Sequence, residues 1–334
     1  MPKKLKIAVV GATGMVGRKM LEILAERQIP IGELIPYASA RSAGSKINYL
    51  GKDYTVVELT EKNIIDRKID YALFSAGGST SRDFAPVFAK HGVVVIDNSS
   101  HWRMDSTVPL IVPEVNSRDI KKHNNIIANP NCSTIQAVVA IAPLHKKFGI
   151  KRIVYSTYQA VSGAGVAGHT DLQNGINGLP PQKFSRPIFD NLIPQIDTFL
   201  DSGYTKEEQK MIDETRKILN NYKIRITATT VRVPVSNGHS ESINVEFNKP
   251  ATLDEVLACL ENAEGIILKA DQNDFPTPLE VSGKDGVFVG RVRMDDSVKS
   301  GINLWVVADN IRKGAATNAV QILETMTKRG KRNS

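Results

Sequence analysis

Cys132 is the residue of this sequence whose type and setting best suit covalent chemistry. It lies in the segment Asn-Pro-Asn-Cys-Ser-Thr at 129–134, after the apolar run 126–128 and before a stretch rich in Ala, Val and Ile. A strand that gives way to a helix here would place the thiol at a helix N-terminus, where unpaired backbone N–H groups and the helix dipole stabilise a thiolate. A lone cysteine can also be a small buried apolar residue, so the motif alone leaves both interpretations open.

A glycine-rich turn near the N-terminus indicates a second kind of chemistry. The apolar run 5–10 leads directly into Gly-Ala-Thr-Gly-Met-Val-Gly at 11–17, and a helical pattern then continues to about Arg27. Glycines at this spacing between a strand and a helix allow a tight turn, close approach of the backbone to a pyrophosphate, and close packing of the helix on the sheet. The segment therefore predicts dinucleotide binding, with a bare structural turn as the alternative. The residues of this predicted cofactor loop are Gly11, Thr13, Gly14, Met15 and Val16.

The segment after the next predicted strand, 33–38, bears on the choice between NAD and NADP. An acidic residue about 20 positions beyond the turn would hold the ribose hydroxyls of NAD, and none is found there. The chain instead carries Ser39, Arg41 and Ser42, two hydroxyls around a guanidinium, which suit a 2′-phosphate better. NADP(H) is the predicted cofactor, with Arg41 as a solvated loop charge as the alternative.

The order of strands and helices changes near residue 150, which predicts two domains. In the first part, strands are expected at 5–10, 33–38, 54–59, 70–75, 93–97, 110–112 and 126–128, and helices near 14–27, 79–91 and 133–148. This alternation is typical of an α/β fold with a Rossmann-type, doubly wound parallel sheet. In the second part, strands are expected at 151–159, 224–235, 242–247, 287–294 and 303–307, and helices near 205–220 and 253–262. That pattern predicts an α+β domain with a mostly antiparallel sheet.

The boundaries that we expect give a dinucleotide-binding domain at 1–132 and a second domain at 133–309. A last helix, near 313–328 within the segment 310–334, is expected to pack back on the first domain. The segment around 175–194 is rich in Gly, Pro and Asn and is expected to form an irregular loop or arm. A chain of 334 residues with 41% hydrophobic and 23% charged residues fits two globular domains.

Charge and composition argue against several other classes of protein. The net charge is +8, but much of it lies at the two ends, in Lys3, Lys4, Lys6 and the segment 328–332. Basic and aromatic residues are not interleaved as nucleic-acid surfaces require, so no nucleic-acid partner is predicted. No apolar run is long enough for a signal peptide or a membrane span, which predicts a cytoplasmic protein without a membrane partner. The six histidines show no ligand spacing, so no metal is predicted, and Cys259 is expected to be a core residue of an amphipathic helix.

Five segments together resemble the aspartate-β-semialdehyde dehydrogenase family, and the resemblance extends over essentially the whole chain. They are the glycine turn 11–17, Ser-Ser-His-Trp-Arg at 99–103, Asn-Pro-Asn-Cys-Ser-Thr-Ile-Gln at 129–136, Tyr-Gln-Ala-Val-Ser-Gly-Ala-Gly at 158–165, and Arg-Val-Pro-Val-Ser-Asn-Gly-His-Ser-Glu at 232–241. The resemblance implies NADPH-dependent reductive dephosphorylation of L-4-aspartyl phosphate to the semialdehyde, or the reverse, in lysine, threonine and methionine biosynthesis. It also implies that the domain at 133–309 is the catalytic, substrate and dimerisation domain. The expected assembly is a homodimer, with a tetramer as the alternative.

The chemistry of such an enzyme assigns roles to particular residues. Cys132 would be the nucleophile, because a thiolate attacks an acyl phosphate readily and yields a thioester. His239 would accept or donate the proton, since an imidazole has a near-neutral pKa. Arg232 can clamp a substrate carboxylate through two parallel hydrogen bonds. Gln159, at the end of a predicted strand, could orient the substrate or steady an oxyanion, or it could simply cap the strand.

The resemblance adds further substrate and cofactor contacts. It implies that Glu207 faces the substrate ammonium and that Arg103, Asn131 and Lys210 bind the phosphate. Without it, Glu207 and Lys210 form an ordinary solvated i,i+3 ion pair on a helix. The small residues Ser162 and Gly163 would let a nicotinamide ring approach the backbone, and Asn310 would meet its carboxamide.

Two alternative functions stay open at this point. Another acyl-phosphate reductase, such as N-acetyl-γ-glutamyl-phosphate reductase, or a glyceraldehyde-3-phosphate dehydrogenase would use the same thiol chemistry with different recognition groups. A non-catalytic homologue that binds a dinucleotide or nucleic acid is the other alternative, and the intact set of Cys132, Gln159, Arg232 and His239 weighs against it.

Overall fold

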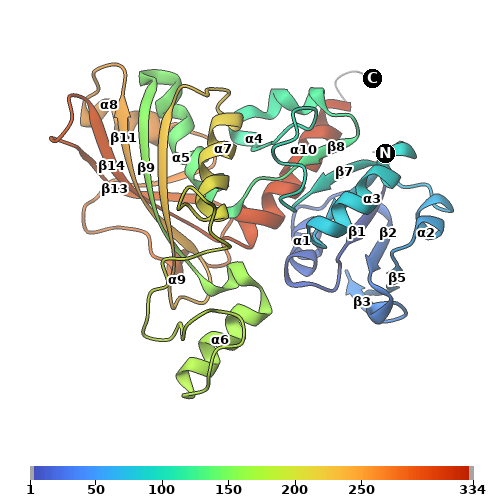
Figure 1. The fold of residues 1–334 in the computed structure, drawn as a ribbon. Coiled ribbons are helices and arrows are strands. Elements are labelled where there is room, and N and C mark those ends of the chain that lie inside the picture. Colours follow the sequence, from blue (N-terminus) through green and yellow to red (C-terminus); the bar gives the residue numbers. More distant parts are fainter. Residues whose placement is uncertain (1–3, 331–334) are drawn as a thin grey trace. The chain divides into compact units, whose positions relative to one another are not determined.

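The computed structural model describes residues 4–330, which divide into two compact units. The first unit contains the chain up to Pro130 and from Ala315 onward, and the second contains Asn131–Gly314 (Figure 1). Of the basic end residues, Lys3 and those at 331–332 lie outside the described residues. Each unit is described by itself below.

The first unit is built on a six-stranded sheet with the strand order β5-β2-β1-β6-β7-β8. Every pairing in it is parallel, which confirms the predicted doubly wound sheet. The order reverses at β1, so the turn that follows β1 lies where open parallel sheets bind ligands. The strands are β1 (Leu5–Val10), β2 (Ile31–Ala38), β5 (Val57–Glu58), β6 (Tyr71–Phe74), β7 (Val94–Asp97) and β8 (Ile126–Ala128).

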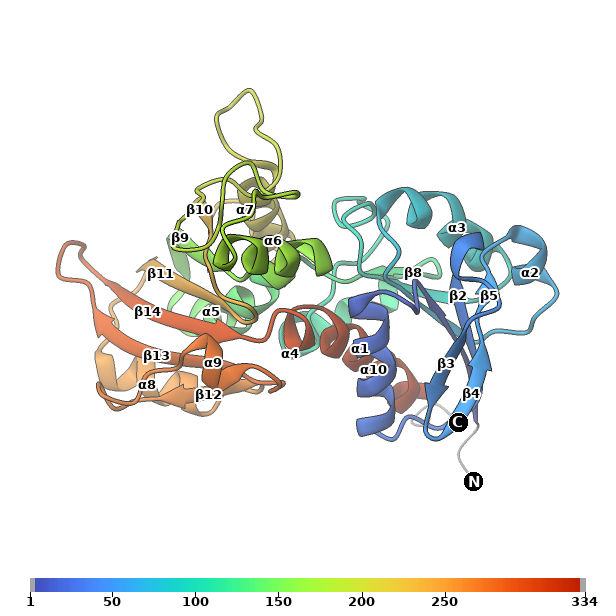
Figure 2. The ribbon, with the colours of Figure 1, turned by 90° about the horizontal axis from the view of Figure 1, so that it is seen from below.

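Helices cover both faces of this sheet. Helices α1 (Met15–Glu26) and α10 (Thr317–Gly330) pack on one face, and α3 (Gly78–Lys90) packs on the other beside α2 (Glu61–Ile65) (Figure 2). The short helix α4 (Pro113–Asn116) contacts α10 and is followed by the 3-10 segment η2 (Ser117–Lys122). This arrangement explains why β1 is almost continuously apolar, because a parallel strand is buried on both faces.

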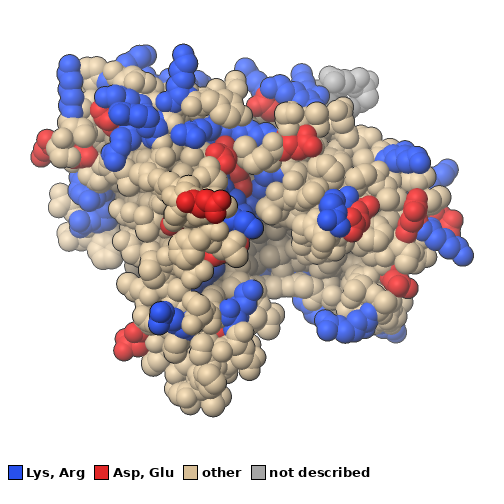
Figure 3. Space-filling model, in the orientation of Figure 1, with Lys and Arg blue, Asp and Glu red and all other residues tan. Residues whose placement is uncertain are grey.

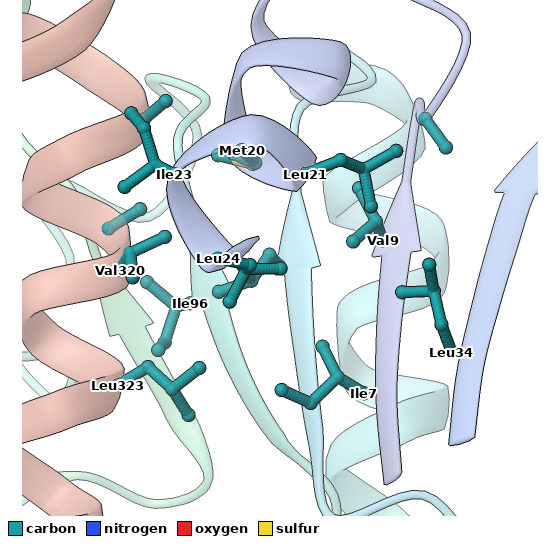
Figure 4. Close-up of a cluster of buried hydrophobic side chains, with 14 of the residues drawn as sticks. Ile7, Val9, Met20, Leu21, Ile23, Leu24, Leu34, Ile96, Val320 and Leu323 are labelled. Carbon is teal, nitrogen blue, oxygen red and sulfur yellow. The ribbon is translucent and has the colours of Figure 1, made fainter. Parts of the chain in front are cut away.

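The core under α1 joins segments from both ends of the chain. Ile7 and Val9 of β1 meet Leu24 of α1, and Val320 and Leu323 of α10 complete the cluster (Figure 4). All five side chains are fully buried. Each such side chain contributes about 1.5–3 kcal/mol through burial, so the C-terminal helix is a structural part of the first unit.

The second unit contains another six-stranded sheet, with the order β10-β9-β11-β14-β13-β12. The three inner pairings are antiparallel and the two outer pairings are parallel, which confirms the mostly antiparallel prediction. The strands are β9 (Ile150–Gln159), β10 (Arg225–Arg232), β11 (His239–Phe247), β12 (Ile266–Lys269), β13 (Val287–Met294) and β14 (Gly301–Ala308).

Three helices pack on one face of this sheet. Helices α5 (Cys132–Phe148), α7 (Lys206–Ile218) and α8 (Leu253–Glu261) pack on it. Tyr155 and Ile243 point into this layer and are fully buried, whereas Tyr158 lies on the opposite face and is exposed. The remaining short elements are η3 (Val161–Ala164), α6 (Val166–Ile176) and α9 (Pro278–Val281).

The structure corrects several predicted elements. The predicted strand 54–59 is divided: β4 (Lys52–Thr55) forms a separate hairpin with β3 (Lys46–Tyr49), and only β5 joins the main sheet. Leu50 and Gly51 both have positive φ angles, 51° and 78°, which matches a tight two-residue hairpin turn. The predicted strand 110–112 is a single bridge from Leu110 to Ala128, because the segment lies between prolines 109 and 113.

Other element ends also differ from the predictions. Strand β10 ends at Arg232 rather than at 235, since the proline at 234 has no N–H to donate to a ladder. Strand β11 begins three residues earlier than predicted, at His239. The last helix is preceded by a π-helical turn, η4 (Arg312–Ala316). Helix α6 and strand β12 were not predicted.

Charged side chains are mixed on the surface. On the face drawn in Figure 3, acidic side chains lie among the basic ones in both units. No helix within residues 4–330 is long and apolar enough to cross a membrane.

Candidate active site

Cys132 begins helix α5, as the sequence predicts. Asn131 is the N-cap, and its Oδ1 accepts hydrogen bonds from the backbone N–H groups of Ser133 at 2.9 Å and Thr134 at 3.2 Å. The thiol is half-buried and takes part in no disulfide. A Cβ at Gly314 would lie 2.9 Å from the Cβ of Cys132, so glycine there leaves room for the cysteine. The helix end can stabilise a thiolate at this position.

The carboxylate of Glu207 on α7 contacts several of the predicted substrate-binding residues. Its Oε1 accepts hydrogen bonds from Asn131 Nδ2 at 2.8 Å and from Gln159 Nε2 at 3.3 Å. Its Oε2 pairs with Lys210 Nζ at 3.2 Å, and Lys210 also pairs with Asp197 at 2.9 Å. The Glu207 side chain is 7% exposed, so this i,i+3 pair is not the solvated surface pair of the alternative interpretation. Burial lowers the pKa of Lys210, but Glu207 and Asp197 outweigh burial and raise it overall.

Arg232 is the last residue of β10 and pairs in register with Gln159 of β9. Its guanidinium is buried, with Nη1 donating to Ala160 O at 2.7 Å and its carbon 5.7 Å from the Phe184 ring centroid. Its Nε has no hydrogen-bond partner within residues 4–330. Burial lowers the pKa of Arg232, and the Glu207 carboxylate partly restores it. A buried guanidinium edge with an unused N–H suits a carboxylate.

His239, the first residue of β11, is fully buried beside Arg232. Its Nδ1 accepts a hydrogen bond from Ala160 N at 3.1 Å, and its Nε2 has no partner among the described residues. Gln136, one turn after Cys132 on α5, donates to His239 O at 3.2 Å and so joins the two chain segments. Burial lowers the pKa of His239 well below its usual value, and the Arg232 charge lowers it further.

The loop before His239 is held by Ser162 and Asn310. Ser162 Oγ lies 3.1 Å from Asn310 Oδ1 and 3.1 Å from Asn237 Oδ1, and Asn310 Oδ1 accepts the N–H of Gly238 at 2.9 Å. Gly163 lies over the site, because a Cβ there would be 2.8 Å from Arg232 Nη1 and 3.3 Å from His239 Nε2. The predicted nicotinamide contacts of Ser162, Gly163 and Asn310 stay predictions.

The sequence analysis gave no role to several residues that shape this site. The peptide of Ala160 holds both Arg232 and His239, and Gln136 joins α5 to β11. Glu241 is fully buried, and neither of its carboxylate oxygens has a partner within the described chain. Burial raises the pKa of Glu241 well above its usual value, and Glu207 raises it further. The sequence did offer one signal for two of these residues. Gln136 in helix α5 and Glu241 in strand β11 are polar residues at positions where an apolar residue would be expected.

The predicted cofactor loop lies between β1 and α1 in the first unit. Gly11 has a φ of +82°, and a Cβ there would lie 2.5 Å from Ser75 O. A Cβ on Gly17 would lie 2.2 Å from Gly11 O, so helix α1 packs against the turn more closely than any side chain allows. Gly14 caps α1 without a side-chain hydrogen bond, and the first turn contains no acidic residue. This cradle and helix N-terminus fit the phosphates of a dinucleotide.

The segment after β2 contains the residues predicted to select NADP, and this role stays a prediction. Ser39 and Arg41 are exposed at the short 3-10 helix η1 (Ala40–Ser42), and Ser42 is partly exposed. Arg103 is instead buried in the first unit, where Nε donates to Asn129 O and Nη2 to Asn98 O, each at 3.0 Å. Cys132 belongs to the other unit, so phosphate binding by Arg103 stays a prediction.

Known proteins resemble this chain over nearly its full length. The family described as "Semialdehyde dehydrogenase, NAD binding domain" matches residues 6–123, and "Semialdehyde dehydrogenase, dimerisation domain" matches residues 141–313. An aspartate-semialdehyde dehydrogenase of Aquifex aeolicus is 54% identical, covering 97% of this chain and 98% of the relative. "Aspartate-semialdehyde dehydrogenase 2" of Vibrio cholerae is 50% identical, with coverages of 98% and 99%.

Solved structures show the same relationship. The crystal structure of aspartate semialdehyde dehydrogenase II from Vibrio cholerae has a TM-score of 0.94 at 50% identity and covers 98% of this chain and 99% of its own. A second structure of that enzyme is complexed with ASA. The Candida albicans enzyme, solved with NADP, has a TM-score of 0.76 at 26% identity, with coverages of 97% and 98%. These names favour one activity over the alternative acyl-phosphate reductases.

Proposed function

Because the chain belongs to the aspartate-semialdehyde dehydrogenase family, we propose that it interconverts L-4-aspartyl phosphate and L-aspartate 4-semialdehyde with NADP(H) through a thioester on Cys132. The observation that carries this proposal is the position of Cys132 at the start of α5, in one cluster with Arg232, His239 and Glu207. The reaction belongs to lysine, threonine and methionine biosynthesis.

Cys132 supplies the nucleophile. The charge interaction with Cys132 raises the pKa of Arg232. Because such an interaction acts on both partners, the guanidinium charge also favours the thiolate form of Cys132. The thiolate attacks the acyl carbon, a C–S bond forms, and the C–O bond to phosphate breaks with its electron pair leaving on the phosphate. Gln159 has its amide beside Glu207, where it can orient the substrate.

Charged side chains recognise the substrate in this proposal. Arg232 uses Nη1 to bind Ala160, and its Nε, which has no partner within residues 4–330, is available to the substrate carboxylate. Glu207 offers a buried carboxylate to the ammonium group. Lys210 keeps its charge through Glu207 and Asp197, which supports a phosphate-binding role with Asn131 and Arg103.

The cofactor is held by the chain's own loops. The turn Gly11–Val16 and the N-terminus of α1 receive the pyrophosphate, and Ser39, Arg41 and Ser42 receive the 2′-phosphate. The bound nicotinamide supplies or accepts a hydride. Preference for NADP is supported by the exposed guanidinium of Arg41 and by the NADP named with the Candida albicans structure.

The face of the second sheet opposite α5 supports a homodimer. A cavity of about 470 Å³ opens there beside Tyr158, Trp305 and Phe275. Tyr158 and Phe275 are exposed by 37% and 47%, so the mouth of this cavity is partly aromatic. This face belongs to the matched dimerisation domain, so a second copy of the chain is the proposed occupant. A cytoplasmic location stays a prediction.

The test replaces each cysteine in turn. Cys132→Ala should lower phosphate-dependent NADPH formation from aspartate semialdehyde by at least about 10⁴-fold, because a missing nucleophile removes the covalent route. Cys259→Ala is the matched control, since Cys259 is a partly buried thiol on α8, and its activity should stay within twofold of the wild type. Activity of Cys132→Ala within a few-fold of the wild type would refute the proposal.

A further inference from the structure

We propose that the Phe184 ring, held in place by the Asp171 carboxylate, positions the Arg232 guanidinium for the substrate carboxylate. The inference rests on the proposed function, because that carboxylate belongs to the aspartyl group. It also gives a role to the segment 182–193, called the arm below, which is part of the irregular loop expected at 175–194.

The Asp171 carboxylate anchors the start of the arm. Asp171 lies on α6 and is 1% exposed. Its Oδ1 accepts the N–H of Gln182 at 2.7 Å, and its Oδ2 accepts the N–H groups of Lys183 at 2.8 Å and Phe184 at 2.7 Å. Burial raises the pKa of Asp171, but these N–H groups and the Lys183 charge outweigh burial and lower it overall. A single ionised carboxylate therefore fixes three successive peptide groups, and the last of them carries the Phe184 side chain.

The Phe184 ring lies over the Arg232 guanidinium. The guanidinium carbon is 5.7 Å from the ring centroid, which is within the distance at which the negative face of an aromatic ring attracts a cation. The attraction is stronger for a guanidinium that is buried, as this one is. Phe184 also packs against a cluster of buried apolar side chains, namely Val161, Leu172, Ile188 and Ile193.

The same arm holds the main chain of Arg232. Ile193 N donates to Arg232 O at 3.0 Å, and Arg232 N donates to Ile193 O at 2.8 Å, which forms an antiparallel bridge at the last residue of β10. The arm therefore contacts Arg232 at two points, the backbone through Ile193 and the guanidinium through Phe184. A third point is the hydrogen bond from Nη1 to Ala160 O at 2.7 Å.

An aromatic ring suits this position because it covers a guanidinium without using its N–H groups. Nη1 is engaged by Ala160, and Nε has no partner within residues 4–330. A polar side chain in place of Phe184 would compete for the remaining donors, and so would water. The ring excludes water from one side of the guanidinium and leaves its donors for a carboxylate. Because an ion pair is stronger where water is excluded, we expect the ring to act on substrate binding.

The nearby carboxylate of Glu207 does not take the place of the substrate carboxylate. Burial lowers the pKa of Arg232 and the Glu207 charge raises it, so the two side chains interact. Both Glu207 oxygens already have other partners, however, since Oε1 accepts from Asn131 and Gln159 and Oε2 pairs with Lys210. The guanidinium that Phe184 covers can therefore bind a second, external carboxylate.

The first test changes the ring and reads the effect on the carboxylate. Phe184→Leu keeps an apolar side chain for packing but removes the negative face. We expect the KM for aspartate semialdehyde to rise about 5- to 30-fold while kcat stays within about threefold of the wild type. β-Aminopropionaldehyde lacks the α-carboxylate of that substrate, so its kcat/KM should fall by less than about twofold. Equal losses with both aldehydes would show that the ring only supports the fold, and would overturn the inference.

Phe189→Leu is the matched control, because it makes the same substitution on the same arm. Phe189 is 47% exposed and lies beside Gly175, where a Cβ would be 2.5 Å from the Phe189 Cβ. Its KM should stay within about twofold of the wild type.

A fluorinated ring separates the charge of the ring face from its shape. A trifluorinated phenylalanine at position 184 keeps the ring but weakens its negative face, so it also serves if Phe184→Leu does not fold. We expect the KM for aspartate semialdehyde to rise at least about threefold. A KM equal to that of the wild type would contradict the proposed attraction.

The second test asks whether Asp171 acts through Phe184. Asp171→Asn replaces one carboxylate oxygen by an amide nitrogen that cannot accept an N–H, so at least one of the three hydrogen bonds is lost. The KM for aspartate semialdehyde should rise, and the change should add little in the Phe184→Leu background. Additive losses would show that Asp171 acts by another route. Wild-type protein that does not turn over aspartate semialdehyde would refute the proposed function, whereas turnover with an unchanged KM in Phe184→Leu would refute this inference alone.

Discussion

Replacement of Gly163 by alanine tests whether the guanidinium and imidazole have the geometry described above. The added Cβ would lie 2.8 Å from Arg232 Nη1 and 3.3 Å from His239 Nε2, against 3.4–4 Å for ordinary contact. Gly163 has no positive φ, so alanine can adopt its backbone conformation and only the new contact matters. The guanidinium cannot move freely, because it is buried and bonded to Ala160 O at 2.7 Å.

The magnitude follows from the displacement required. The guanidinium must move by roughly half an ångström, and a misplacement of about 1 Å can cost about 100-fold in rate. We therefore expect kcat/KM for aspartate semialdehyde to fall about tenfold to 100-fold, which is about 1.4–2.8 kcal/mol. The change should appear mainly in the KM for the semialdehyde.

A double-mutant cycle makes the test specific. Arg232→Lys removes the atom that the new Cβ would contact, so Gly163→Ala should cost much less in that background. Val166→Ala is a neighbouring control, because Val166 is 67% exposed. The reasoning fails if Gly163→Ala is as active as the wild type or loses as much in the Arg232→Lys background. A rise in the KM for NADP alone would show that position 163 acts through the cofactor.

Two further substitutions test the cofactor site and the buried glutamate. Arg41→Ala should raise the KM for NADPH about 10- to 100-fold and leave that for NADH nearly unchanged, since a hydrogen bond to a charged group contributes about 1.5–3 kcal/mol; equal effects on both cofactors would contradict the 2′-phosphate assignment. Glu241 has a raised pKa in the folded state, so the folded protein holds a proton that the unfolded chain releases above the ordinary glutamate pKa. Stability should therefore fall as pH rises from that value towards the folded-state pKa, and Glu241→Gln should flatten the dependence of Tm on pH; parallel Tm curves for the two proteins would show that Glu241 is ionised.

Short-range features of this protein were predictable from sequence. The glycine spacing at 11–17 follows from steric limits that act within one turn, and the structure contains the tight turn and close helix packing that it predicts. A helix start beside Cys132 was predicted from the apolar run before it and the stretch rich in Ala, Val and Ile after it, whereas the Asn131 cap is seen in the structure. The alternating strands and helices similarly predicted the parallel sheet.

The arrangement of the site depended on contacts between distant segments. The parallel register of β9 and β10 places Arg232 opposite Gln159. Sequence analysis identified both residues but not the Ala160 peptide, whose N–H and C=O bind His239 and Arg232. A backbone group has no signature in the sequence, because every residue carries the same one. Its partners are known only when the strands are in place.

The sequence thus determined which chemical groups this protein possesses and the local structures that carry Cys132 and the cofactor loop. The tertiary structure decided the burial and pairing of those groups: a His239 whose pKa is lowered by burial and by the Arg232 guanidinium, a Glu207 with its donors in place, and a Glu241 without any within the described residues. The physical reason is that propensity and steric limits act over a few residues, whereas desolvation and charge–charge interactions depend on which distant segments exclude water together.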